Sequence, residues 1–460
     1  MKAFLLAAAA LSIVAAPASA ARRTLDEVAD RAARNDAWAW DFVEGLTTEV
    51  GPRQAGTEAE ARGRAWAVKW LKAKGFANVA DEPYIMDTWV PGDVMLAAIV
   101  APYAQPLTVV PLGNSAATPV GGLTAEVVRF ASYADLEAAP VGSLAGKIAF
   151  IDHAMRPTQD GSGYGFAGPA RWTGPGLAAS KGAVATVIRS IGTETDRTPH
   201  TGGTAFPAGV TPTPAAALSN PDADNLARMI ARARGRPVML RLELNPRSLG
   251  QTESGNVVGE IGGRDPKLPP VLLACHLDSW WNGTGAFDDA AGCGIIAAAA
   301  LAVQAYSSPP LRTIRVLFAG AEETGLWGSK AYATAHKGEP VFAGLESDFG
   351  ADRVWRIESN FTASDPELYG KLARGVARFG VAPSRETATG GADLDWVREA
   401  KGALVDLQQD GTRYFDLHHT NNDTLDKIDP AQLRQNVAVW TMVVGILANH
   451  PDPPRFAQVR

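Results

Sequence analysis

This chain has few cysteines, only a small excess of one charge sign and few long apolar runs. Only two of its 460 residues are cysteine, which excludes a small scaffold stapled by disulfides. The 43 basic and 49 acidic residues are interspersed and leave a net charge of −6. The Ala-rich run at 295–303 ends in polar residues before it reaches the about 20 apolar residues of a membrane span. We therefore expect no nucleic-acid partner, no anionic membrane surface and no membrane span.

The two cysteines leave two interpretations open. Cys275 is expected on a strand, and Cys293 in the helix that packs on it. An exported chain could join them in a disulfide, and two buried thiols are an equally good interpretation.

The first 20 residues have the pattern of a signal peptide. Lys2 supplies the positive start, residues 4–16 the apolar core, and Ala18–Ala20 a cleavage site of small residues. This pattern predicts an exported protein, either periplasmic or secreted. The whole chain is 46% hydrophobic, and it is long enough for two or three domains of roughly 100–200 residues each.

The composition changes twice after this leader. Residues 21–102 begin with helical patterns and form the first part of a predicted α/β domain. Residues 103–245 alternate short β-like runs with Gly-, Pro- and Thr-rich loops, which predicts an inserted β-rich domain. In residues 246–450 strands alternate with helices, which predicts the second part of the α/β domain, with a doubly wound mixed sheet. Residues 451–460 are Pro-rich, and we expect a flexible tail.

Polar residues follow several apolar runs in this second part. In open α/β sheets, ligand sites form outside the carboxyl ends of the strands, so such residues can converge on one crevice. Each of them alone is more often a structural histidine, a solvated pair or a helix cap. Together they supply ligands for two metal ions. The residues concerned are His276, Asp278, Asp288, Glu322, Glu323, Asp348 and His419.

Their types and number fit two zinc ions. Zinc binds imidazole nitrogen and carboxylate oxygen, and two ions about 3.5–4 Å apart need a shared ligand such as a carboxylate. We expect Asp288 to be this bridge. His276 and Asp348 would complete one metal site, and Glu323 and His419 the other.

Two further carboxylates have separate roles in this hypothesis. Asp278, two residues beyond His276, is expected to accept the second imidazole proton and fix the ring. Glu322 is adjacent to a ligand but points in another direction. We expect it to take a proton from a metal-bridging water and deliver it to the leaving amine.

The same segments resemble the sequence blocks of the two-zinc aminopeptidase and carboxypeptidase family, most closely its carboxypeptidase Q branch. The resemblance extends over essentially the whole mature chain. One departure is Cys275, where the family more often has glycine. The five metal blocks are residues 274–280, 285–292, 319–325, 346–350 and 417–424, and further matches are residues 51–57, 189–192, 199–202 and 390–396.

The resemblance implies a zinc-exopeptidase fold with a protease-associated insert, two zinc ions, and the roles given above, with Glu322 as base. It also implies a cis peptide after Asp288. A homodimer is compatible with it. The substrate contacts that it offers are His200, Asp393, Asp395 and Tyr414.

The leading hypothesis is a zinc-dependent exopeptidase that hydrolyses dipeptides or short peptides with a free amino terminus. The insert is expected to close over the cleft and exclude larger substrates. One alternative is a broader aminopeptidase or carboxypeptidase acting on longer peptides. Two others are a receptor-like binding protein on the same scaffold and a cyclising transferase with a single zinc. The complete ligand sets and Glu322 argue against the last two.

Overall fold

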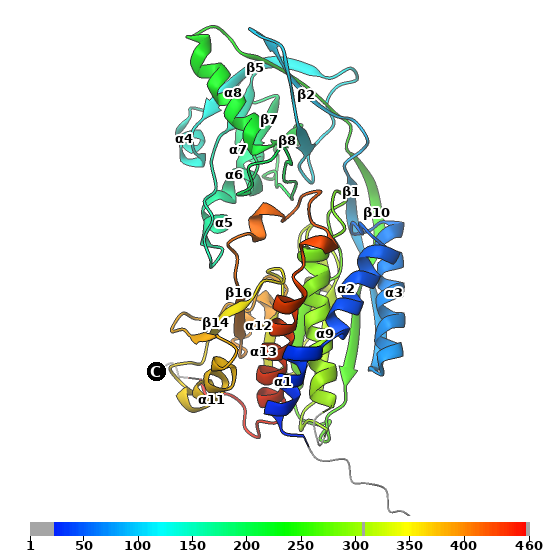
Figure 1. Ribbon diagram of the computed structural model, residues 1–460. Helices are drawn as coiled ribbons and strands as arrows, with labels where there is room; N and C mark the ends of the chain where they lie inside the picture. Colours follow the sequence, from blue (N-terminus) through cyan, green and yellow to red (C-terminus); the bar gives the residue numbers. More distant parts are fainter. Residues whose placement is uncertain (1–22, 306–308, 457–460) are drawn as a thin grey trace, which may run out of the picture.

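The chain forms two units that are stacked end to end and joined by two long strands. The computed structural model describes residues 23–305 and 309–456. The strands β1 (Ala77–Val90) and β10 (Arg247–Ile261) pair antiparallel and run from one unit into the other (Figure 1). The predicted signal peptide, residues 1–20, and the end of the predicted tail, residues 457–460, lie outside the described residues.

The lower unit of Figure 1, residues 23–90 and 247–456, is built on a mixed sheet of order β1-β10-β12-β11-β13. A parallel bridge from Gly344 to Leu404 leads on to a three-stranded sheet of order β15-β14-β16. Because β11, β12 and β13 are parallel, their carboxyl ends share one edge. The strands are β11 Val271–His276, β12 Ile314–Ala319, β13 Ala343–Glu346, β14 Val354–Ser359, β15 Ala382–Pro383 and β16 Val405–Gln409.

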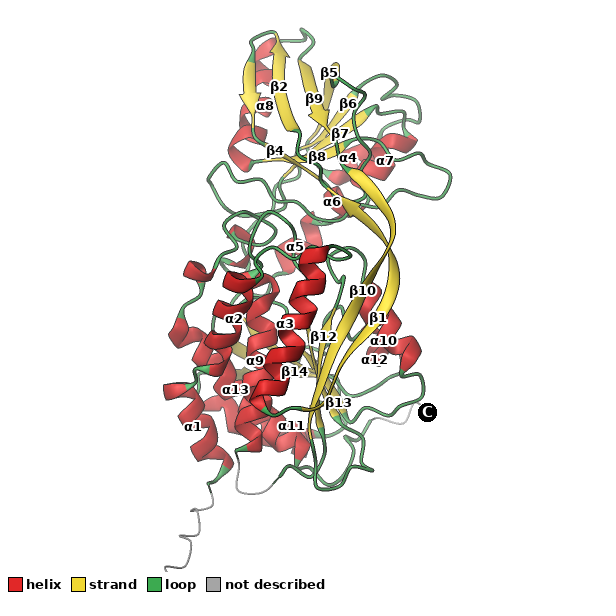
Figure 2. Cartoon of the chain, turned by 90° about the vertical axis from the view of Figure 1, so that its right-hand side faces the viewer, coloured by secondary structure: helices red, strands yellow, loops and turns green. Residues whose placement is uncertain are grey.

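Helices cover both faces of this sheet, because its strands are apolar on both sides. Val257 and Leu273 belong to the core that includes α9, whereas Val258 and Leu272 belong to a second cluster on the other face. Figure 2 shows α2, α3, α9 and α13 on one side of the sheet, and α10 and α12 on the other. The helices are α1 Leu25–Asn35, α2 Trp38–Glu49, α3 Glu58–Lys74, α9 Ala291–Gln304, α10 Trp327–Ala335, α11 Pro366–Ala377, α12 Asp395–Glu399 and α13 Pro430–Ala448.

The central helix of this core is α9. With the turn before it, Ala286–Gln304 is the one helix of the described residues that is long and apolar enough to cross a membrane, and its 18-residue apolar window is entirely buried inside the protein. A helix that is apolar on all sides is typical of such a buried position. Gly294 lets α2 approach closely, because a Cβ atom there would lie 2.9 Å from the carbonyl oxygen of Ala39.

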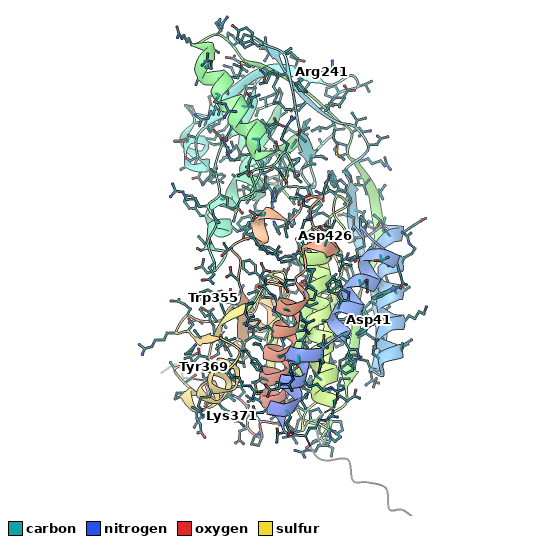
Figure 3. All side chains as sticks on the ribbon, in the orientation of Figure 1. Asp41, Arg241, Trp355, Tyr369, Lys371 and Asp426 are labelled. Carbon is teal, nitrogen blue, oxygen red and sulfur yellow. A yellow bond between two sulfur atoms is a disulfide. The ribbon has the colours of Figure 1, made fainter. Side chains whose placement is uncertain are left out.

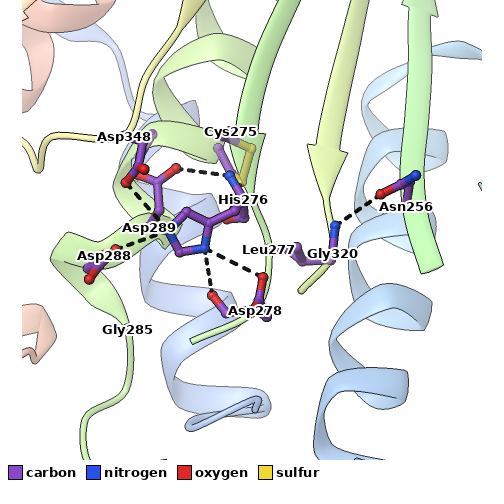
Figure 4. The surroundings of a disulfide bond; sticks show 12 residues. Asn256, Cys275, His276, Leu277, Asp278, Gly285, Asp288, Asp289, Gly320 and Asp348 are labelled. Atoms are coloured by element: carbon purple, nitrogen blue, oxygen red, sulfur yellow. Dashed lines mark hydrogen bonds and ion pairs between the residues drawn. A yellow bond between two sulfur atoms is a disulfide. The ribbon is translucent and has the colours of Figure 1, made fainter. Parts of the chain in front are cut away.

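A disulfide joins Cys275, on β11, to Cys293, on α9 (Figure 4). Of the two interpretations that the sequence leaves open, the structure therefore has the bridge. It ties the strand that ends in His276 to the helix that follows Asp288.

Replacing both cysteines by alanine should lower the free energy of unfolding by about 3 kcal/mol, because the bond closes a short loop in the unfolded chain. The two residues are 18 positions apart. Urea denaturation of the oxidised wild type and of the Cys275→Ala/Cys293→Ala variant measures the difference. Reduced wild type is the control and should lose a similar amount. An unchanged midpoint in the variant would contradict this expectation.

The upper unit, residues 91–246, is built on an eight-stranded sheet of order β3-β2-β9-β5-β6-β7-β8-β4. Side chains fill both units (Figure 3), where Arg241 marks β9 near the top of the view. The strands are β2 Met95–Ala101, β3 Gln105–Leu107, β4 Val109–Pro111, β5 Leu123–Phe130, β6 Ile148–Ile151, β7 Ala185–Arg189, β8 Ala215–Leu218 and β9 Met239–Leu244. The helices are α4 Tyr133–Ala138, α5 Ser162–Ala167, α6 Pro169–Trp172, α7 Gly174–Ser180 and α8 Asn220–Ala233.

The strand β2 belongs to the upper sheet, although it precedes the boundary predicted at residue 103. It pairs with β9, and Ala97 lies opposite Leu242. The chain therefore passes from the lower to the upper sheet between Val90 and Met95. The change of composition near Tyr103 coincides with the turn between β2 and β3, because an apolar strand has the same composition in either sheet.

Candidate metal centre

Polar residues from four strand ends meet at one edge of the lower sheet. β11, β12 and β13 are parallel, and the bridge from β13 to the start of β16 is parallel too. The turn before α9 reaches the same place. The residues brought together are His276 at the end of β11, Glu322 and Glu323 after β12, Asp348 after β13, His419 in the loop after β16, and Asp288 in the turn.

The carboxylate of Asp288 lies between two groups of possible ligands. Its Oδ1 atom is 3.0 Å from Nε2 of His276, which is also 3.4 Å from Oδ1 of Asp348. Its Oδ2 atom is 3.4 Å from Nε2 of His419, which is 2.8 Å from Oε2 of Glu323. One carboxylate therefore faces two sets, each with one imidazole and one further carboxylate.

The donor atoms of this centre are better suited to binding cations than to hydrogen-bonding with one another. Oδ2 of Asp288 and Oε1 of Glu323 are buried and have no hydrogen-bond partner among residues 23–305 and 309–456. Buried polar atoms are ordinarily paired, so such orphans mark a place for a ligand. Imidazole nitrogen and carboxylate oxygen are ligands that zinc accepts, and the residues present fit two such ions.

Three carboxylates of the centre have a raised pKa, whereas hydrogen bonding and charge from His276 lower the pKa of Asp288 against the effect of its burial. Burial, the largest cause, raises the pKa of Glu322 and Glu323 well above the usual value, and neighbouring carboxylates add to the rise. Burial also raises the pKa of Asp348, although His276 opposes it. Cations at this position would favour the ionised forms.

Protein treated with a chelator should lose stability as the pH rises from about 4 to about 7. Burial is the largest cause that raises the pKa of Asp393 and of Asp423 from 3.8 to about 7. The folded protein thus holds protons that the unfolded chain releases, so its free energy of unfolding falls across this range and levels off above it. Thermal melts at several pH values measure the fall. A zinc-saturated control should show a smaller fall, and a chelated protein that is most stable above pH 7 would contradict the expectation.

Asp278 contacts His276 through two oxygens. Nδ1 of His276 is 3.1 Å from the backbone carbonyl oxygen of Asp278 and 3.6 Å from its carboxylate. The carboxylate also accepts a hydrogen bond from the backbone N–H of Glu322, at 3.1 Å. The nearer acceptor is therefore the carbonyl, and the carboxylate links the histidine to the segment that carries Glu322.

Asp289 links the end of β11 to the start of α9 through hydrogen bonds. Its Oδ2 atom accepts the backbone N–H of His276, at 3.2 Å (Figure 4). Its Oδ1 atom accepts that of Gly292, at 3.0 Å. The peptide bond between Asp288 and Asp289 is cis, as the family resemblance implies.

Two residues that sequence reasoning left without a role support the same turn. Arg53 is fully buried and donates to the carbonyl oxygens of Thr284, at 2.6 Å, and Gly285, at 2.9 Å. Asp423 accepts the backbone N–H groups of Phe287, at 2.6 Å, and of Asp288. An arginine inside a Gly- and Pro-rich turn was the available signal for Arg53, and the closeness of Asp423 to His419 was the signal for Asp423.

The upper unit reaches the centre through His419. Nδ1 of this ring is 3.2 Å from the backbone carbonyl oxygen of Thr201, and the N–H of Thr201 donates to the carbonyl oxygen of His419, at 3.1 Å. Within the lower unit, Nε1 of Trp280 donates to Oε2 of Glu323, at 2.6 Å. Thr201 and Trp280 thus each orient one candidate metal ligand, as groups that hydrogen-bond to metal ligands commonly do.

A cavity of about 590 Å³ lies over the centre, between the two units. Glu322, Glu323 and Asp348 form part of its floor. Tyr164, Arg171, Trp172 and Gly203–Ala205 line it from the upper unit, and Phe349, Tyr414, Phe415 and His418 from the lower one.

The structure does not bring His200 and Asp395 to this cavity. His200 is 1% exposed, and its Nε2 atom is 2.5 Å from Oε2 of Glu194, so its ring already has a hydrogen-bond partner. Asp395 begins α12 and pairs with Arg398, at 2.5 Å. The family resemblance suggested both residues, but their side chains are engaged elsewhere.

The other predicted contacts lie nearer. Tyr414 lines the cavity, and its ring packs 5.2 Å from that of His418. Asp393 is fully buried beside Ala392, which lines the cavity. The ring of His418 stacks on that of His419, with centroids 3.5 Å apart, and lines the cavity.

Known peptidases share this sequence and architecture. Residues 256–444 match the family model of peptidase family M28. Carboxypeptidase Q of Bos taurus is 31% identical over 411 residues, which cover 88% of this chain and 84% of that protein. The crystal structure of a peptidase M28 precursor from Shewanella amazonensis SB2B is 42% identical, with a TM-score of 0.90 over 95% of this chain and 98% of that one. A zinc aminopeptidase of Bacillus subtilis, 20% identical with a TM-score of 0.61 over 88% and 93% of the two chains, shares the fold.

The fold and these similarities define a hydrolase of the metallopeptidase class. Within that class, the chain belongs to peptidase family M28. The α/β fold predicted from the sequence is confirmed, and so is the resemblance to carboxypeptidase Q.

Proposed function

We propose that the protein is a zinc-dependent exopeptidase that hydrolyses dipeptides or short peptides with a free amino terminus. The observation that carries the proposal is the position of Asp288. Its two oxygens face two sets of ligands, and Glu322 lies beside them on the floor of the cavity. The likeness to carboxypeptidase Q and to zinc aminopeptidases supports an exopeptidase.

Two zinc ions would be held by His276, Asp288 and Asp348 on one side and by Asp288, Glu323 and His419 on the other. When bound, such ions lower the pKa of water and stabilise the oxyanion that develops on a peptide carbonyl. Zinc is supported by the mixed imidazole and carboxylate donors, since magnesium and calcium prefer oxygen ligands alone.

Side chains of the protein would orient the metal ligands and transfer the proton during hydrolysis. Glu322 faces the cavity, and it would take the proton of the attacking water and give it to the leaving amine. Its backbone N–H is held by Asp278, which also contacts His276, so base and ligand share one support. Trp280 holds Glu323 in a fixed orientation while Glu322 moves its proton.

The upper unit covers the cavity, and this supports the proposal that the substrates are small. The upper unit lies over the centre with Tyr164 and Trp172, and its Thr201 hydrogen-bonds His419. A folded protein has no access to a floor of this kind, whereas a short peptide fits a volume of about 590 Å³. Export from the cytoplasm is part of the proposal, and a disulfide between Cys275 and Cys293 supports it.

A peptide panel tests the function. Dipeptides and peptides of about ten residues, each with free or blocked termini, are incubated with the protein before and after chelation. We expect release of the amino-terminal residue from dipeptides, loss of activity with chelator and recovery with zinc. Equal turnover of long peptides would favour the broader aminopeptidase or carboxypeptidase. No turnover by zinc-loaded protein would favour the receptor-like alternative.

A further inference from the structure

A buried guanidinium lines the cavity from the upper unit. Arg171 lies on α6 and is 4% exposed. Its Nη2 atom donates to the hydroxyl of Tyr164, and its Nη1 atom lies 3.4 Å from the carbonyl oxygen of Thr201 and 3.3 Å from Nδ1 of His419. These partners are all uncharged or weakly basic, so none of them neutralises the guanidinium.

No carboxylate oxygen of the part of the chain that the structure describes lies within ion-pair distance of Arg171, and its buried Nε atom has no hydrogen-bond partner there. This is unusual, because buried charges are ordinarily paired. Arg189 in the same unit is paired with Asp152 and Asp224. Arg53, a fully buried arginine of the lower unit, donates from Nε, Nη1 and Nη2 to backbone carbonyls. Arg171 therefore lines the cavity without a counter-ion.

The surroundings keep a space for this guanidinium. A Cβ atom at Gly202 would lie 2.5 Å from both Cζ and Nη1 of Arg171, and Gly202 has a φ of +135°, which disfavours other residues. On another side the guanidinium carbon lies 5.3 Å from the centroid of the Tyr164 ring. The glycine and the tyrosine thus hold the arginine in a fixed place without giving it a counter-ion.

This place lies one imidazole ring away from the candidate zinc ligands. Nδ1 of His419 faces Arg171, whereas Nε2 of the same ring faces Glu323 and Asp288. An extended residue spans at most about 3.3–3.6 Å, so a group at Arg171 would belong to the residue directly after the scissile bond. In a dipeptide that residue carries the terminal carboxylate. In a longer peptide it carries an uncharged amide.

We propose that Arg171 binds the carboxyl-terminal carboxylate of the substrate, and that this contact selects dipeptides among peptides with a free amino terminus. The inference rests on the proposed exopeptidase function and adds the residue that binds the carboxyl terminus of the substrate. Arginine suits a carboxylate because its planar fork can donate two parallel hydrogen bonds.

The test compares alanyl-phenylalanine with its carboxamide, which differ only in the terminal charge. The ratio of their kcat/KM values is measured in zinc-loaded wild type, Arg171→Gln and Arg171→Lys. Arg129→Gln is the matched control, because Arg129 lies on β5 and is 40% exposed and paired with Asp152, at 2.6 Å. Zinc content is measured in each protein, since Arg171 contacts His419.

We expect the wild type to prefer the free acid roughly 10- to 100-fold, the usual effect of a hydrogen-bonded charge. The ratio should approach one in Arg171→Gln, take an intermediate value in Arg171→Lys and stay unchanged in Arg129→Gln. A wild-type ratio near one overturns the proposal, and so does a wild-type ratio retained in Arg171→Gln. If Arg171→Gln does not fold, an unchanged ratio in Arg171→Lys has the same meaning. Failure of the exopeptidase function itself would appear differently, as hydrolysis of neither compound.

Discussion

Glu322→Gln should keep two zinc ions per chain and lose hydrolysis by roughly a hundredfold to ten-thousandfold, the range typical of general acid–base catalysis. The amide has the shape of the carboxylate but cannot accept a proton. Glu322 lines the cavity, whereas Glu323 beside it contacts His419 at 2.8 Å. The loss should therefore fall on kcat, with zinc binding preserved.

Glu323→Gln is the matched control for this result. It removes the same charge one position along the chain, and it should instead weaken zinc binding at the site shared with His419. Zinc analysis by mass spectrometry and steady-state kinetics on a dipeptide separate the two outcomes. Full turnover by Glu322→Gln with its zinc intact would exclude Glu322 as the base.

Asp288→Asn should lose zinc from both positions together. Each oxygen of Asp288 faces a different histidine, at 3.0 Å and 3.4 Å. An amide supplies a single oxygen and no charge, so neither set would be complete. Loss of a residue that only supports a ligand typically lowers metal affinity 10- to 100-fold, and we expect the loss here to be larger, with activity lost in parallel.

His276→Ala and His419→Ala serve for comparison, since each should affect mainly one of the two ions. Asp395→Asn is the control for removal of a carboxylate outside the cavity and should leave zinc content unchanged. Titration of the zinc-free proteins by calorimetry gives the number of sites and their affinities. One site retained in Asp288→Asn at wild-type affinity would show that Asp288 is not the bridge.

The sequence predicted the sheet edge well because its signals are local. Apolar runs that end in His276, Glu322 or Asp348 identify both the strands and their polar ends, and parallel strands put such ends together. The helices α9 and α13 are equally visible from composition. The structure brings the predicted ligands together as that argument expects.

The remaining features depend on contacts between distant segments. Arg53 hydrogen-bonds residues more than 200 positions away, with 231 to Thr284, and Arg171 reaches His419 across 248. The turn around Arg53 marks it as unusual, but the residues around either arginine do not indicate its distant partners. His200 is the reverse case, because its motif suggested a substrate contact while Glu194, six residues away, occupies its ring.

The ribbon of β1 and β10 has a consequence for how the chain folds. The hydroxyls of Thr88 and Thr252 lie 2.6 Å apart, although 164 residues separate them. Closing so long a loop by chance costs entropy that grows with its length. Once residues 95–244 have folded, β2 and β9 are neighbours. The end of β1 and the start of β10, which adjoin them in the chain, then lie side by side. During synthesis the upper unit is complete before β11 has been made, so it can act as a template that starts the edge of the lower sheet.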